Sequence, residues 1–293
     1  MVKKIEILIF LFILLPFGLF SQNNKKENMF LERITGNVKE SINIFNYKDI
    51  YGQETSGKTI KKYDKSGYIT EKLEFNAEGQ NMTYQKFFYD KKNNLIETQF
   101  LDSEGTQIYG HTYFKYDDKN NFIEQSNNDS KETYVYNEKG NLIEEKSQTS
   151  YSSSRYVYKY DNKNLLIEEE MYFEEGEPPY KKTFLYDEKN RLVKELEYNQ
   201  KGKVRLTMEY GYDKSGKMIK KPFISEGVVA TNNLVYKNNL LIEENIIKAN
   251  KQIGKLEYIY NKELVKEIKH SYNIDDGETI TYTGSEKIEY VLY

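Results

Sequence analysis

The sequence contains no cysteine and only two histidines among its 293 residues. Without cysteine the chain has no disulfide, no thiol nucleophile and no cysteine on which a lipid anchor could be placed. The two histidines, His111 and His270, have no second His or Cys at the spacing of a metal-ligand set, which argues against a zinc or iron site. The absence of cysteine therefore excludes disulfide scaffolds and thiol enzymes, and a zinc or iron site is not expected.

Neither sign of charge dominates the chain. Lysine and arginine number 43, aspartate and glutamate 46, and the formal net charge is −3. This balance gives no electrostatic reason to bind nucleic acid or an anionic membrane surface. Aromatic residues make up 15% of the chain beside 30% charged residues, which indicates a folded domain.

A long apolar run occurs once, over residues 7–20, and it is shorter than the roughly 20 residues that a membrane-spanning helix needs. Lys3 and Lys4 precede it, and Ser21 and a polar stretch follow it, which is the pattern of a secretory signal peptide. The alternative is an uncleaved membrane anchor. We predict a signal peptide over residues 1–21, a polar leader over 22–36 and a single domain over 37–293, exported to the periplasm or cell surface of a Gram-negative bacterium.

One phrase, Tyr-Asp-x-x-Gly/Asn-x-Leu-Ile, returns about nine times at spacings of 20 to 27 residues. A fixed period indicates one small unit stacked many times. Asp or Asn opens each turn and Gly or Asn closes it, as in a type I turn followed by a left-handed residue. The closing residues of the clear copies are Gly67, Asn93, Asn120, Gly140, Asn164, Asn190 and Gly216.

The residues on either side of each turn alternate as strands do, for example Tyr156-Val157-Tyr158-Lys159-Tyr160. Looser turns such as Asn76–Gly79 and Asp102–Gly105 separate successive copies. We therefore predict an all-β protein of stacked antiparallel β-hairpins that form one long curved or spiralling sheet, with strand pairing beginning near Val38. The alternative is a β-propeller, because two repeats supply about the four strands of one blade.

The runs Tyr-Val-Tyr-Asn-Glu-Lys-Gly-Asn-Leu-Ile at 134–143 and Phe-Leu-Tyr-Asp-Glu-Lys-Asn-Arg-Leu-Val at 184–193 resemble the YD repeats of the RHS family. The resemblance covers most of residues 37–270 and implies repeated hairpins joined into a spiral or shell. Large members of that family enclose a toxin domain or mediate adhesion. The chain ends at Tyr293 inside a strand-like run, so no effector domain is expected to follow, and it lacks the Asp-Pro-rich segment linked to self-cleavage, so the toxin function is not expected here.

Motifs that could carry chemistry have a simpler structural interpretation. Residues 52–59 fit the phosphate-loop pattern Gly-x4-Gly-Lys-Ser/Thr, but no helix can follow because Asp64 already opens a turn, so a polar loop between strands is expected. Residues 117–120 and 273–278 gather oxygen ligands without the register of a calcium loop. No catalytic, cofactor or metal residues are predicted, and no enzyme activity is expected.

Tyrosine is abundant, with 28 residues. The structural interpretation is that each tyrosine before a turn packs its ring on the next repeat and leaves its hydroxyl at the surface. The functional interpretation is an exposed aromatic track that binds carbohydrate or another envelope protein. The residues predicted to form such a surface are Tyr134, Tyr156, Tyr158, Tyr160, Tyr258 and Tyr260. A non-enzymatic binding or scaffold protein is the leading hypothesis; an envelope hydrolase with paired carboxylates and a purely structural part of a larger assembly are the alternatives.

Overall fold

The computed structural model of the protein describes residues 34, 37–48, 53–173, 177–225, 227–262, 264–275 and 279–292. The predicted signal peptide and almost all of the polar leader lie outside these residues. Among the residues it describes, the structure contains no helix long and apolar enough to cross a membrane. Strands and turns account for the described chain, which confirms the all-β prediction.

The strands follow one another along the whole domain. They are β1 (Val38–Lys48), β2 (Glu54–Tyr63), β3 (Ile69–Phe75), β4 (Asn81–Tyr89), β5 (Leu95–Leu101), β6 (Ile108–Tyr116), β7 (Phe122–Ser126), β8 (Ser130–Tyr136), β9 (Leu142–Thr149), β10 (Ser153–Tyr160), β11 (Leu166–Tyr172), β12 (Tyr180–Tyr186), β13 (Leu192–Tyr198), β14 (Val204–Glu209), β15 (Gly211–Tyr212), β16 (Met218–Ser225), β17 (Val228–Lys237), β18 (Leu240–Lys248), β19 (Lys251–Asn261), β20 (Leu264–Asp275) and β21 (Thr279–Leu292).

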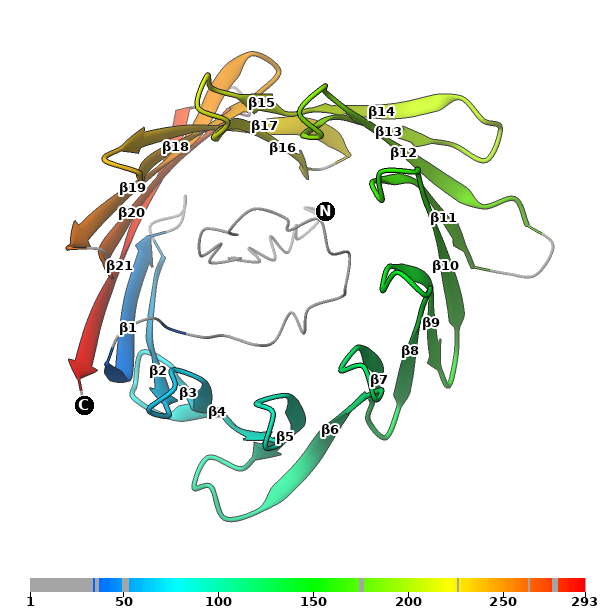
Figure 1. Ribbon diagram of the computed structural model, residues 1–293. Helices are drawn as coiled ribbons and strands as arrows, with labels where there is room; N and C mark the ends of the chain where they lie inside the picture. Colours follow the sequence, from blue (N-terminus) through cyan, green and yellow to red (C-terminus); the bar gives the residue numbers. More distant parts are fainter. Residues whose placement is uncertain are drawn as a thin grey trace, which may run out of the picture.

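Successive strands pair antiparallel from β2 to β21, and β1 pairs with both β2 and β21. The sheet therefore closes into a ring, in which blue β1 lies beside red β21 (Figure 1). β14 and β15 are two parts of one interrupted strand, and the N–H of Tyr210 between them still bonds to the carbonyl of Val193 at 3.0 Å. The predicted stacked hairpins are confirmed. The β-propeller alternative is wrong, because the strands form one continuous ladder instead of separate blades.

Closure solves the problem that a long antiparallel meander creates at its two ends. An unpaired edge strand presents a row of free N–H and C=O groups to which another chain can add. In the described part of the chain, the first strand β1 pairs with the last strand β21. Ile42 lies opposite Glu289, and Phe45 lies opposite Glu286. The sheet therefore has no unpaired edge strand among the described residues.

The turns of the Tyr-Asp motifs, here called tight turns, have the predicted geometry. In the first, the N–H of Gly67 bonds to the carbonyl of Asp64 at 3.0 Å and the N–H of Asp64 to the carbonyl of Tyr68 at 2.8 Å. The Asp64 carboxylate accepts from the N–H of Ser66 and of Tyr68. Every closing residue predicted to be left-handed has a positive φ, from 59° at Asn190 to 93° at Gly216. Short polar side chains and glycine thus fix these hairpins locally.

Each tight turn is followed by a register shift, so that Tyr63 pairs with Ile69 while Lys62 pairs with Glu71. On the strands beyond it, side chains alternate strictly between two faces of the sheet. One face, here called the core face, carries Tyr134, Glu145 and Tyr156 in cross-strand register. The other, here called the charged face, carries Glu144, Val157 and Glu170 in register.

Neighbouring hairpins separate near the tight turns, and tyrosine hydroxyls bridge the gaps. Between β7 and β8 the backbone pairing stops at Glu124 and Thr133, which leaves the carbonyl of Phe122 without a backbone donor from β8. Tyr136 donates its hydroxyl to that carbonyl at 2.7 Å. The same bond recurs around the ring at 2.6 to 3.0 Å, from Tyr89 to Ile69, Tyr116 to Leu95, Tyr136 to Phe122, Tyr160 to Leu142, Tyr186 to Leu166, Tyr212 to Leu192, Tyr260 to Leu241 and Tyr290 to Val265.

This tyrosine ladder corrects the structural interpretation of the motif. The ladder hydroxyls are not left at the surface; each reaches back to the first or second strand residue after the preceding tight turn. A buried carbonyl without a donor costs about 1 to 3 kcal/mol, so the hydroxyl replaces a backbone bond where the strands diverge. The aromatic rings of Tyr89, Tyr116 and Tyr136 meanwhile pack against the buried cluster that contains Leu95, Phe122 and Leu142.

Where the sheet closes, aromatic side chains lie against glycines. The ring of Phe45 lies against Gly57, where an added Cβ would stand 2.5 Å from it, and the ring of Tyr47 lies against Gly284, where an added Cβ would overlap it. Gly57 belongs to the phosphate-loop-like sequence. The predicted polar loop is wrong for this stretch, because residues 54–59 are part of strand β2 and the glycine makes room for an aromatic ring.

Candidate functional site

The six tyrosines predicted to form a binding surface lie on the core face or in the tyrosine ladder. Tyr134 is buried, and the other five are half-buried. Tyr160 and Tyr260 donate to ladder carbonyls. Tyr134, Tyr158 and Tyr258 donate to Glu132, Glu145 and Glu244 at 2.5, 3.2 and 2.6 Å. The rings of Tyr156 and Tyr158 stack with centroids 6.5 Å apart. The structure does not bring the six together as one exposed track, and their role in binding stays a prediction.

The core face carries carboxylates at depths where charge is costly. Glu195 and Glu197 are both 8% exposed, and Glu244 is 6% exposed. The Nζ of Lys182 lies between two carboxylates of this face, 3.8 Å from Glu169 and 3.7 Å from Glu195. Burial raises the pKa of Glu169, and Lys182 offsets only part of this while Glu195, Glu145 and Glu197 add to it. Burial also raises the pKa of Tyr158. The protonated form of the Glu169 carboxyl is therefore favoured relative to that of an exposed glutamate.

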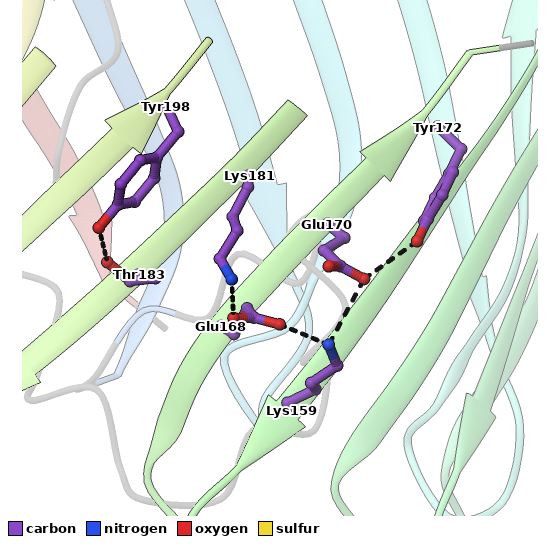
Figure 2. Close-up of polar contacts among 7 residues, drawn as sticks. All are labelled: Lys159, Glu168, Glu170, Tyr172, Lys181, Thr183 and Tyr198. Carbon is purple, nitrogen blue, oxygen red and sulfur yellow. Dashed lines mark hydrogen bonds and ion pairs between the residues drawn. The ribbon is translucent and has the colours of Figure 1, made fainter. Parts of the chain in front are cut away.

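The charged face is a network of exposed ion pairs. Lys159 lies 2.5 Å from Glu168 and 3.6 Å from Glu170, and Lys181 pairs with the other oxygen of Glu168. Figure 2 shows this chain of contacts, together with the hydroxyl of Tyr172 on Glu170. Such surface pairs contribute about 0 to 1 kcal/mol each, so they maintain solubility and register more than stability.

An aromatic surface interrupts the charged face on strands β4, β5 and β6. Three positions in one cross-strand row, Phe88, Glu97 and Tyr113, place two exposed rings on either side of a carboxylate. The next row holds Lys86, Gln99 and His111. We call these six residues, together with Tyr109, the aromatic platform. Tyr109 is 64% exposed, Tyr113 47% and Phe88 38%.

Within the platform the polar groups are already oriented. The rings of His111 and Tyr113 are nearly parallel, at 5°, with centroids 5.6 Å apart. One oxygen of Glu97 contacts His111 Nδ1 at 2.7 Å and accepts a bond from Gln99 at 2.9 Å. Because all of these side chains stand on paired strands, their spacing is set by the sheet. A stacked pair of rings can offer an aromatic face to a flat apolar surface, and the carboxylate and carboxamide beside it can bond to hydroxyl groups at the edge of that surface.

Sequence reasoning missed this platform because it followed the tyrosines of the motif. Tyr109, His111 and Tyr113 lie at alternate positions of β6, and that pattern was visible in the sequence. Such alternation indicates one aromatic face on a strand, but nothing in the strand itself shows that this face is the exposed one. The same strand carries Phe114, which is 5% exposed on the core face.

The residues considered as metal ligands have other partners. Within the described residues, no three His, Cys, Asp or Glu side chains are grouped so that they could hold a metal ion. Asp117 uses its two carboxylate oxygens to accept from the backbone and side-chain nitrogens of Asn121, at 2.7 and 2.8 Å. The segment 273–278 lies partly outside the described residues.

No protein-family model matches the chain, and no curated protein matches it. Among solved structures it is similar to TcdB2-TccC3 without its hypervariable C-terminal region, at 13% identity and a TM-score of 0.38 over 82% of this chain; it spans only 16% of that chain. It is also similar to a porin-like protein from Bacteroides uniformis ATCC 8492, at 12% identity and a TM-score of 0.41, over 88% of this chain and 99% of the other. Membership of the RHS family stays a prediction.

Proposed function

We propose that this protein is a non-enzymatic binding module of the cell envelope whose aromatic platform binds carbohydrate. The observation that carries the proposal is the stacked pair of half-buried His111 and exposed Tyr113, whose nearly parallel rings lie beside Glu97 and Gln99. Export rests on the predicted signal peptide over residues 1–21. The closed sheet acts as a rigid support that holds the rings in place.

The chemistry of the platform favours a sugar over an apolar ligand. A pyranose ring has an apolar C–H face that stacks on an aromatic ring, whose face carries partial negative charge. Its hydroxyl groups need fixed donors and acceptors, which Gln99 and Glu97 supply beside the rings. Phe88 and Tyr109 extend the surface across β4 and along β6, so more than one sugar unit of a polymer can be in contact. Recognition of a protein partner, in which tyrosine is also frequent, is the other outcome that the experiment must detect.

The Tyr113→Ala variant should bind carbohydrate at least about tenfold more weakly, because an exposed aromatic anchor is lost while the sheet stays intact. A glycan array on the mature protein identifies the ligand, and calorimetric titration of the variant measures the loss. His111→Ala should show a similar loss. Tyr151→Ala is the matched control, since Tyr151 is 98% exposed and lies in the turn between β9 and β10. Equal losses in Tyr113→Ala and Tyr151→Ala, or capture of a protein but no glycan, would contradict the proposal.

A hydrolase is the second candidate function, favoured by Glu169 on the core face. A general acid needs a carboxyl that stays protonated near neutral pH, and burial together with Glu195 and Glu145 raises the pKa of Glu169. Glu195 shares Lys182 with it and would be the second carboxylate of the pair. Two carboxylates in these roles are the arrangement used in glycoside hydrolysis.

If the hydrolase hypothesis holds, Glu169→Gln should lower the release of new reducing ends from polysaccharides by at least about a hundredfold. Glu168→Gln is the control, because Glu168 is its neighbour in sequence and lies on the charged face among lysines. Turnover that is unaffected by Glu169→Gln, or no turnover in the unmodified protein, would leave the binding module as the better account.

A further inference from the structure

Neighbouring tight turns are joined by pairs of asparagine side chains. Asn94 of one turn donates to Asn120 of the next at 2.7 Å, and Asn120 donates back to Asn94 at 3.1 Å. Asn141 and Asn164 make the same reciprocal pair at 2.6 and 3.1 Å. In each pair one residue directly follows a tight turn and the other is the left-handed residue of the following turn. Two primary carboxamides thus close the gap between adjacent hairpins.

Between the turns of β6–β7 and β8–β9 this pair is missing one member. Asn121 occupies the position of Asn94 and Asn141, but the left-handed residue of the following turn is Gly140, which has no side chain. The side chain of Asn121 is held as that of Asn94 is: its Nδ2 donates to Asp117 at 2.8 Å, just as Asn94 Nδ2 donates to Asp90 at 3.0 Å. Its Oδ1 is buried and has no hydrogen-bond partner, and the residue is only 4% exposed.

A groove lies at this place. Its volume is about 580 Å³, and its walls include Asn121, Tyr136, Asn137 and Gly140. The backbone pairing between β7 and β8 ends at Glu124 and Thr133, so the two strands diverge toward the groove. A buried polar oxygen without a partner is costly, and Asn121, which carries it, is one of the residues that line this groove.

We propose that this groove binds a primary carboxamide, in the position that an asparagine side chain fills between the other turns. The two occupied pairs define the chemistry: a carboxamide offers one N–H to Asn121 Oδ1 and its own oxygen to the Nδ2 of Asn121. A secondary amide in the trans form has its N–H and C=O on opposite sides and cannot make both bonds at once. A carboxylate offers no donor to Oδ1. The ligand is therefore a free primary amide or the Asn or Gln side chain of a polypeptide.

The test uses the full chain labelled with ¹⁵N and follows the side-chain amide signal of Asn121. Acetamide should shift this signal and saturate at millimolar concentration, whereas N-methylacetamide and acetate should not. A Gly-Gln-Gly peptide with acetyl and N-methylamide ends, compared with free acetamide, distinguishes a polypeptide source from a free amide. Tighter binding of the peptide identifies the polypeptide, and equal or weaker binding identifies the free amide.

Gly140→Asn should abolish the acetamide shift, because the new side chain supplies the missing carboxamide. Asparagine holds this turn position at φ of 59° to 72° elsewhere in the ring, so the backbone accepts it. Gly216→Asn is the matched control: it adds the same side chain to another tight turn, where the nearest atom to an added Cβ is 3.8 Å away, and it should leave the shift unchanged.

The proposal is overturned if acetamide produces no saturable shift, which would mean that water alone fills the groove. It is also overturned if N-methylacetamide or acetate shifts the signal equally, a comparison that needs only the unmodified protein.

Discussion

Glu286→Ala should destabilise the protein by about 3 to 5 kcal/mol, the usual cost of removing one member of a buried charged cluster. Glu286 is 1% exposed on β21, at the closure of the ring. It accepts from Tyr47 at 2.5 Å and from Asn43 at 2.9 Å, both on β1, and lies 3.2 Å from His270 Nε2 on β20. Without the carboxylate, Tyr47, Asn43 and His270 stay in the closure of the ring but lose this charged partner.

Urea unfolding of Glu286→Ala and of Glu289→Ala measures this effect. Glu289 lies on the same strand and is exposed, so its replacement should change the free energy of unfolding by less than about 0.5 kcal/mol. Similar values for the two variants would show that the cluster does not hold the closure together.

The same cluster predicts a dependence on pH. Burial alone would raise the pKa of Glu286, but contacts from His270, Tyr47 and Asn43 hold it below its usual value of 4.5. A carboxyl with a lowered folded pKa stabilises the protein above its unfolded pKa, and this contribution is lost as the pH falls through the folded pKa. The difference in stability between the unmodified protein and Glu286→Gln should therefore be largest above pH 4.5 and shrink below it.

Tyr160→Ala should cost about 3 to 5 kcal/mol, of which Tyr160→Phe should reproduce about 1 to 3 kcal/mol. The smaller change removes only the hydroxyl that donates to the carbonyl of Leu142 at 2.6 Å. The larger change also removes the ring, half-buried against the neighbouring repeat. Thermal and urea unfolding of the two variants separate the hydrogen bond from the packing.

Tyr151→Phe is the control for the ladder, because Tyr151 is 98% exposed, and it should leave stability unchanged within about 0.5 kcal/mol. If Tyr160→Phe is as stable as the unmodified protein, the hydroxyl does not replace a backbone bond, and the tyrosine of the motif acts through its ring alone.

Local chemistry made much of this fold predictable. Asp64 and Gly67 define a hairpin by themselves, since a carboxylate bonds to the backbone two residues on and glycine accepts a positive φ. Repetition of that unit about nine times predicts a meander, and the structure confirms it. The gap between the hairpins was not predictable in the same way. That the hydroxyl of Tyr136 reaches Phe122 depends on where the backbone pairing stops.

The candidate site was harder to predict than the fold. An alternating strand shows two faces, but the strand alone does not say which face its neighbours cover. The platform needs Phe88, Glu97 and Tyr113 from three strands in one row, a matter of register between hairpins. The motif tyrosines drew attention to Tyr134, which is buried because its face packs against Phe122.

The sequence by itself determined the repeating hairpin, the left-handed turn residues and the all-β class, because each depends on residues within a few positions of one another. Tertiary structure alone decided that the sheet closes, since the pairing of β1 with β21 depends on the curvature summed over every repeat. It also decided which aromatic rings are exposed, because the face of a strand that becomes covered depends on residues that are distant in the sequence. Local rules set each turn, and only the accumulated geometry of all of them brings the first strand beside the last.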